Sequence, residues 1–293
     1  MKCFEGLGIA LVTPFKEDGE VDFVALGNII EHQITNGADF LCILATTAET
    51  PTLSKDEKKK IKEFIVTQAD GRVPLLMGCG GNCTSTVCRE LQENDWSGID
   101  GVLSVVPYYN KPSQEGIYQH FKAIAESSPL PIVLYNVPGR TGTNMTAETT
   151  LRIAHECKNV VAIKEASGDM AQIRQIINGK PNGFEVLSGD DMLTLQMIKE
   201  GGKGVISVIA NGITKEFADI VHMAIQGKMQ QAEEMEEKYK RLYRLLFVDG
   251  NPAGIKTLMA EKGMLKNYLR LPLVPASEET KESIKKLMVN GQR

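Results

Sequence analysis

Residues 160–169 read Val-Val-Ala-Ile-Lys-Glu-Ala-Ser-Gly-Asp, an apolar run that ends in a lysine. Successive apolar residues of this kind predict a buried β-strand with Lys164 at its carboxyl end. Because side chains alternate along a strand, Lys164 should share a face with Val160, while Val161 points to the other face. The pKa of a buried lysine falls readily, and the neutral amine can attack carbonyl compounds. The alternative is a lysine that extends from the strand end into solvent.

Similar apolar runs recur along the whole chain. Eight of them are predicted strands, at residues 8–13, 40–44, 74–78, 101–106, 131–136, 160–165, 185–188 and 204–207. Amphipathic segments with helical spacing lie between them, for example at residues 22–35, 54–69, 113–127, 146–155 and 190–200. Strict alternation implies parallel strands with helical crossovers. Eight such units, with no early Gly-x-Gly-x-x-Gly turn, favour a (β/α)₈ TIM barrel over an open doubly wound sheet.

The pattern changes after residue 211, where only helical segments follow. They are predicted at residues 215–226, 229–246, 252–262 and 277–288. We therefore expect a catalytic barrel domain over residues 1–226 and a C-terminal helical extension over residues 227–293. No low-complexity linker separates the two parts, so the extension should pack on the barrel.

The composition argues against several classes of protein. Thirty-three Lys and Arg residues balance 37 Asp and Glu residues, without a basic cluster beyond Lys58–Lys60, which argues against a nucleic-acid partner. The apolar N-terminal segment is too short to span a membrane, and we expect a cytoplasmic protein without a signal peptide or anchor. The cysteines form no Cys-x-x-Cys pair and the histidines are scattered, so we expect reduced thiols and no metal site.

Polar side chains follow several of the predicted strands at their carboxyl ends, where barrels of this kind place their active sites. Tyr135 has inward parity on the strand before Lys164, so the phenol and the amine can converge. A lysine that condenses with a ketone needs an acid and a base, which a chain of hydroxyl groups from Tyr135, Thr47 and Tyr109 can supply. Taken alone, Tyr135 can equally be a core residue with its hydroxyl bonded to backbone.

Two other features suggest that carboxylates are bound near this amine. Backbone N–H groups in the turn at Thr46 and Thr47 can hold one carboxylate, although this turn can also be read as a helix cap ahead of Ser54. Arg140 lies in a Pro-Gly turn and can grip a second carboxylate with its forked guanidinium. A solvated loop arginine is the alternative.

These motifs closely resemble the dihydrodipicolinate synthase family, which belongs to the N-acetylneuraminate lyase group of class I, Schiff-base aldolases. The similarity runs from about residue 6 to residue 275. The segments that carry it are Thr46-Thr47-x-Glu49, Pro107-Tyr108-Tyr109-Asn110, Tyr135-Asn136-Val137-Pro138-Gly139-Arg140-Thr141, Ile163-Lys164-Glu165-Ala166-Ser167-Gly168-Asp169, Asn251-Pro252 and Leu269-Arg270-Leu271-Pro272.

The resemblance implies a lyase reaction of lysine and diaminopimelate biosynthesis. Pyruvate would form a Schiff base with Lys164, and its enamine would attack L-aspartate 4-semialdehyde to give 4-hydroxy-tetrahydrodipicolinate. The resemblance makes Tyr135 the acid and base, with Thr47 and Tyr109 completing the proton relay. It implies neither a cofactor nor a metal.

The resemblance also assigns the binding residues and an assembly. The backbone of Thr46 and Thr47 would hold the pyruvate carboxylate, Arg140 would anchor the aldehyde, and the Ile206 carbonyl would line the pocket. A homotetramer, built as a dimer of dimers, is implied. Tyr108 or Tyr109 would then reach across a dimer interface.

The chain departs from the family pattern at two places. Ala45 and Ala48 stand where the family usually has glycines, and we expect a negative φ at both because alanine in the left-handed region costs roughly 1 kcal/mol. In lysine-inhibited relatives the effector site has an acidic residue in place of Thr86 and histidines in place of Lys55 and Lys58. We therefore expect weak or absent inhibition by lysine.

Two other functions remain open at this point. One is another pyruvate-dependent aldolase or lyase of the same group, such as an N-acetylneuraminate lyase or a keto-deoxy sugar acid aldolase. Arg140 argues against it, because a sugar substrate calls for neutral hydroxyl partners and a short anionic aldehyde for a charged one. The other is a catalytically inactive barrel that acts as a binding protein.

Overall fold

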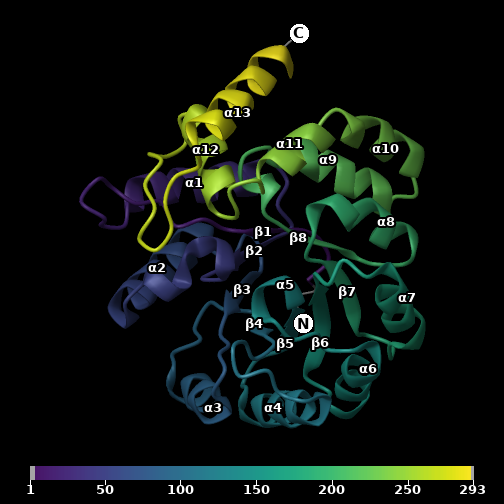
Figure 1. The fold of residues 1–293 in the computed structure, drawn as a ribbon. Helices are drawn as coiled ribbons and strands as arrows, with labels where there is room; N and C mark the ends of the chain where they lie inside the picture. Colours follow the sequence, from purple (N-terminus) through teal and green to yellow (C-terminus); the bar gives the residue numbers. More distant parts are fainter. Residues whose placement is uncertain (1–3, 292–293) are drawn as a thin grey trace.

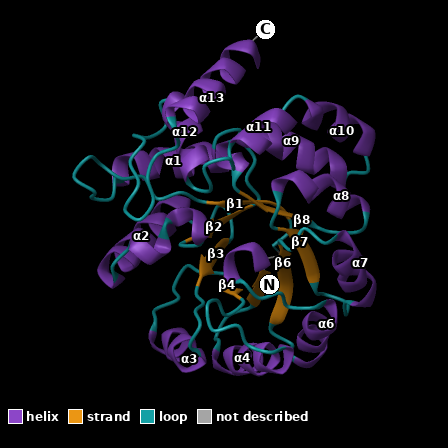
Figure 2. Cartoon of the chain, viewed as in Figure 1, coloured by secondary structure: helices purple, strands orange, loops and turns teal. Residues whose placement is uncertain are grey.

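Eight parallel strands close into a barrel in the computed structural model, which describes residues 4–291. The strands are β1 (Gly6–Ala10), β2 (Phe40–Ile43), β3 (Leu75–Gly78), β4 (Gly101–Val105), β5 (Ile132–Asn136), β6 (Val160–Glu165), β7 (Glu185–Ser188) and β8 (Gly204–Ser207). Each strand pairs with the next, and β8 returns to β1. Figures 1 and 2 show the ring of strands enclosed by helices. The fold is a TIM barrel with a C-terminal helical extension, as the alternating pattern predicts.

The outer layer consists of one helix or helical segment after each strand. The helices are α1 (Phe23–Thr35), α2 (Lys55–Ala69), α3 (Thr84–Glu93), α4 (Gln114–Ser127), α6 (Ala147–Glu156), α7 (Met170–Gly179), α8 (Thr194–Lys199) and α9 (Thr214–Ile225), with a short α5 (Pro138–Thr141) after β5. Several begin at a side chain that accepts a backbone N–H, namely Asp22, Ser54, Ser113, Thr146 and Asp169. Such caps satisfy donors that a helix start leaves open, which is why the starts at Asp22, Ser54, Ser113 and Thr146 were predictable.

The first strand lies earlier in the chain than predicted. It ends at Ala10, whereas the apolar run continues to residue 13. The residues after Leu11 leave the sheet, and the Thr13 hydroxyl donates to the carbonyl of Ala48 over 2.8 Å. The end of the apolar run thus supports the turn that follows β2 instead of extending the barrel.

The extension comprises α10 (Met229–Glu237), α11 (Lys240–Leu245), α12 (Ala253–Glu261) and α13 (Glu278–Gly291). A single helix over residues 229–246 is wrong, because a turn at residues 238–239 separates α10 from α11. In this turn, the backbone N–H of Tyr239 donates to the carbonyl of Glu236, three residues back, over 2.8 Å. That tighter turn breaks the α-helical ladder.

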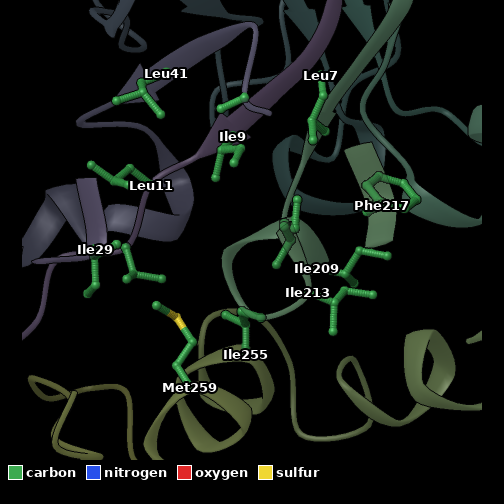
Figure 3. Packing of buried hydrophobic residues seen from close by; sticks show 14 of the residues in the cluster. Leu7, Ile9, Leu11, Ile29, Leu41, Ile209, Ile213, Phe217, Ile255 and Met259 are labelled. Carbon is green, nitrogen blue, oxygen red and sulfur yellow. The ribbon is translucent and has the colours of Figure 1, made fainter. Parts of the chain in front are cut away.

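The extension packs on the barrel through one shared apolar cluster, as expected. Figure 3 shows Ile255 and Met259 of α12 in the same cluster as Ile209 and Leu11 from the barrel. All four side chains are at most 2% exposed. Burial of this kind stabilises by about 25 cal/mol per Å² of apolar surface, which ties the extension to the barrel.

Some features are notable for their absence among residues 4–291. No helix there is long and apolar enough to cross a membrane. The same residues contain no group of three or more His, Cys, Asp or Glu side chains arranged to hold a metal ion. Cys42, Cys79 and Cys157 are buried free thiols, while Cys83 is exposed.

Candidate active site

Lys164 lies at the carboxyl end of β6, inside the barrel, with 4% of its surface exposed. The parallel register places it opposite Tyr135 of β5. Its Nζ atom lies 4.4 Å from the centroid of the Tyr135 ring, and Tyr135 is itself 6% exposed. The amine therefore does not extend into solvent. It lies beside the Tyr135 ring, as the strand order and side-chain parity predict.

A β-bulge in β6 alters the predicted alternation of faces. The pairing with β5 shifts by one residue, so that Val161 is the extra residue on β6. Val160 packs in the cluster between strands and outer helices, while Val161 packs against the barrel interior. The expectation that Val160 shares the face of Lys164 is therefore wrong. Ala162, beyond the bulge, does face the interior.

The surroundings of the amine are small and mostly apolar. Within residues 4–291, Lys164 forms no ion pair. Cys42 lies nearby, and burial raises the pKa of its thiol to about 11, which keeps the thiol neutral. A Cβ atom at Gly189 would lie 3.1 Å from Lys164 Cε and 2.7 Å from Ala166 Cβ, so the end of β7 requires glycine for space. The glycine thus lets the end of β7 approach the Lys164 side chain closely.

Glu165, the next residue, points to the opposite face and belongs to a polar network that sequence reasoning missed. Burial raises the pKa of this carboxyl. Its oxygens accept hydrogen bonds from Asn136 Nδ2 at 3.1 Å, Ser167 N at 2.7 Å and Gln172 Nε2 at 3.2 Å. The network fixes the ends of β5 and β6, on which Tyr135 and Lys164 are carried.

The threonine turn, which we define as residues 44–49, follows β2 at the same end of the barrel. Ala45 has a φ of −100°, and Ala48 is also outside the positive-φ region, as expected. The left-handed residues are instead Leu44 (φ 50°) and Glu49 (φ 55°), which bracket the turn. The helix-cap reading of the threonines is excluded, because the Ser54 side chain caps α2.

Donors for an anion are present in this turn. Among the described residues, the backbone N–H groups of Thr46 and Thr47 donate to no protein acceptor. The Thr47 side chain is 2% exposed, and its Oγ1 accepts a hydrogen bond from Asn251 Nδ2 over 3.1 Å. Because this oxygen acts as the acceptor, its own proton remains free to donate elsewhere. The Thr46 hydroxyl has no partner within residues 4–291.

Arg140 is exposed on α5, which lies over the middle of the strand ring in the view of Figure 1. Its Nη2 atom donates to the backbone carbonyl of Asn251 over 3.3 Å. No carboxylate within residues 4–291 pairs with it. Asn251, which was not among the predicted site residues, therefore contacts both Thr47 and Arg140. No local sequence pattern signals this, because the three residues are distant in the chain.

Two predicted site residues occupy different settings. Ile206 of β8 is 1% exposed and lies in the barrel interior with Tyr135. Tyr109, by contrast, has a left-handed backbone (φ 73°) and is 88% exposed, while its neighbour Tyr108 is 43% exposed. A single copy of the chain does not enclose Tyr109.

Comparison with known proteins gives a consistent result. The model of the dihydrodipicolinate synthetase family matches residues 3–290. The 4-hydroxy-tetrahydrodipicolinate synthases of Phocaeicola vulgatus and Parabacteroides distasonis are each 54% identical over 284 residues, covering 97% of this chain and 96% of their own. The crystal structure of the dihydrodipicolinate synthase of Thermotoga maritima superposes with a TM-score of 0.96 at 41% identity, covering 99% of both chains. The chain belongs to the dihydrodipicolinate synthetase family.

Proposed function

We propose that this chain is a 4-hydroxy-tetrahydrodipicolinate synthase, a lyase that condenses pyruvate with L-aspartate 4-semialdehyde. The observation that carries the proposal is the buried Lys164 amine at the carboxyl end of β6 beside Tyr135, with no ion pair to any residue in the described range 4–291. Supporting it is the name shared by curated relatives over nearly the whole chain. The product enters lysine and diaminopimelate synthesis, and a cytoplasmic location belongs to the same proposal. The reaction requires neither a metal nor a cofactor.

The first half-reaction activates pyruvate. The amine of Lys164 attacks the keto carbon, and a proton from Tyr135 allows the hydroxyl of the resulting carbinolamine to leave as water. The imine then withdraws electrons from the methyl group, which loses a proton to give an enamine. In the second half-reaction the enamine carbon attacks the aldehyde, and the amino group of the aldehyde substrate displaces the lysine as the ring closes.

Protons must move to and from this buried site through hydroxyl groups. We assign Tyr135, Thr47 and Tyr109 to the relay. The Thr47 hydroxyl accepts a hydrogen bond from Asn251, so its own proton is available for donation, which supports its place in the relay. Comparison of the activities of Thr47→Val and Thr46→Val identifies which of the two hydroxyls takes part in the proton relay, because each variant removes one hydroxyl and keeps the side-chain shape.

Tyr109 fits the relay only if a second copy of the chain covers it, given its exposure and left-handed backbone. We therefore propose that the chain assembles as a homotetramer, a dimer of dimers in which Tyr109 reaches the neighbouring active site. One structural relative, at a TM-score of 0.96 and 41% identity, is described as a monomeric dihydrodipicolinate synthase variant. Assembly is thus a property to be measured for each chain, and sedimentation measures it directly.

Carboxylate binding divides between the threonine turn and Arg140. The N–H groups of Thr46 and Thr47, which have no acceptor among residues 4–291, suit the pyruvate carboxylate, and the Ile206 carbonyl lines the pocket in this assignment. Arg140, which pairs with no carboxylate in the described part of the chain, suits the carboxylate of the aldehyde.

Arg140→Met is expected to raise the KM for aspartate semialdehyde by about 10- to 100-fold, because a charge-assisted bond contributes roughly 1.5–3 kcal/mol. Steady-state kinetics with each substrate varied in turn measure this. Trapping of pyruvate by borohydride should be unaffected, since pyruvate binds elsewhere. Arg140→Lys keeps the charge but not the forked guanidinium. Its KM for aspartate semialdehyde should lie between those of the wild type and Arg140→Met. An unchanged aldehyde KM would assign the anchor to another residue.

Feedback by lysine is expected to be weak or absent. Thr86 is exposed on α3, and Lys55 and Lys58 begin α2, so these positions offer the effector's ammonium no carboxylate and add positive charge. One structural relative, from Cyanidioschyzon merolae (TM-score 0.94, 37% identity), is described with lysine bound. Assays with added lysine check the prediction, and inhibition at micromolar lysine contradicts it. Thr86→Glu should increase sensitivity.

One substrate comparison tests the function itself. Pyruvate is supplied with aspartate semialdehyde in one assay and with N-acetylmannosamine in another. Consumption of the semialdehyde alone is the expected result. Consumption of the sugar alone would identify a sialic acid lyase. Failure of pyruvate and borohydride to modify the enzyme would identify an inactive barrel.

A further inference from the structure

Glu49 ends the threonine turn with a fully buried carboxylate. Its side chain is 0% exposed, although glutamate is rarely buried without a partner. Its backbone N–H donates to the Thr46 carbonyl over 3.1 Å, closing the turn. The left-handed φ of 55° costs about 1–3 kcal/mol for a residue with a Cβ, so contacts outside the turn must hold it.

Those contacts come from the C-terminal extension, which we place at residues 227–293. Lys256 of α12 is also 0% exposed and forms an ion pair with Glu49 through Nζ and Oε1. The other carboxylate oxygen accepts the backbone N–H of Arg270 over 3.0 Å. Both oxygens of Glu49 are therefore held by the extension.

Lys256 is in turn held in one position. Its Nζ donates to the Tyr268 carbonyl over 3.0 Å and lies 4.3 Å from the centroid of the Phe15 ring. Burial lowers the pKa of Lys256 to about 8, and Glu49 opposes that effect. The amine keeps its charge near neutral pH because Glu49 is present.

A buried ion pair is weak evidence for a contribution to stability, because desolvation offsets most of the attraction. Specific placement is the better-supported role for such a pair. Here the pair acts on the segment that carries Thr46 and Thr47, and Asn251, from the loop before α12, contacts Thr47 independently. Two separate contacts thus run from the extension to the same turn.

We propose that Lys256 is a positioning residue for the active site. By pairing with Glu49, it holds the threonine turn in the conformation that presents the N–H groups of Thr46 and Thr47 to the carboxylate of the keto acid. The C-terminal extension is then part of the substrate-binding machinery and not only a support for the barrel. This inference rests on the proposed function.

Three variants separate positioning from stability. Lys256→Met leaves Glu49 buried without its cation, so this variant should lower the unfolding temperature and also raise the half-saturating pyruvate concentration. Glu49→Gln/Lys256→Met has no buried charge to leave unpaired and should regain much of the unfolding temperature. Lys262→Met is the matched control. It removes another bond from the extension to the barrel, the 2.6 Å bond to the Gly212 carbonyl, which does not involve the threonine turn.

The measurement is borohydride trapping of full-length enzyme over a range of pyruvate concentrations, without the aldehyde. The double variant is expected to need about tenfold more pyruvate than the wild type, while Lys262→Met needs the same amount. A double variant with wild-type half-saturation overturns the inference, whatever its unfolding temperature. The half-saturating pyruvate concentration of the double variant decides the question even if Lys256→Met does not fold, because the double variant has no unpaired buried charge. Absence of trapping in the wild type would instead refute the proposed function.

Discussion

Lys164→Ala is expected to lower kcat by on the order of 1,000-fold or more, because it removes the only group assigned to bond covalently with pyruvate. The side chain is buried and forms no ion pair among the described residues, so its loss should leave the fold intact. The coupled assay with aspartate semialdehyde measures kcat. Mass spectrometry after borohydride treatment with pyruvate should show the mass of one reduced pyruvate on the wild type and none on the variant.

The control for this experiment is Lys199→Ala. Lys199 lies at the end of α8 on the outer layer, with a side chain that is 67% exposed. It should retain full activity and full labelling. Peptide mapping should place the wild-type label on Lys164. Labelling of a different lysine, or a Lys164→Ala variant that keeps its activity, would contradict the Schiff-base assignment.

Several barrel strands could be predicted with their bounds because of their composition. β6, β7 and β8 match the apolar runs residue for residue, since each run is short and has turn residues such as Gly or Asn close to at least one end. The convergence of Lys164 and Tyr135 was predictable from strand order and the parity of residues at the carboxyl ends alone. The strand bounds and this convergence depend only on local pattern and on the rule that sequential strands in a barrel are neighbours.

Features that depend on tertiary contacts could not be predicted in this way. The bulge at Val161 arises from how β6 pairs with β5. Strict alternation of side chains along a strand holds only where the pairing is regular, so the sequence alone could not predict the bulge. The placement of Asn251 against Thr47, and of Lys256 against Glu49, joins residues separated by more than 200 positions. Neither contact has a signature in the local sequence, because buried polar pairs are specified by the packing around them.

Tyr135→Phe is the second change with a large expected effect. Tyr135 is 6% exposed and faces the amine across the strand pair, so phenylalanine can occupy its place without a cavity. Loss of the hydroxyl removes the proton donor for dehydration of the carbinolamine. General acid–base catalysis of this kind contributes about 100- to 10,000-fold, and kcat should fall by that order. The ring remains beside Lys164, so the unfolding temperature should change little.

Tyr118→Phe is the matched control for the tyrosine experiment. Its hydroxyl donates to Glu156 on the outer layer over 2.5 Å, away from the barrel interior. Both variants lose one phenol, but only Tyr135→Phe should slow the formation of the imine, measured as the rate of borohydride-sensitive labelling at saturating pyruvate. If imine formation is unchanged while kcat falls, Tyr135 acts only after the first half-reaction. If neither rate changes, the hydroxyl is a structural group, and the proton must reach the carbinolamine through the threonine turn.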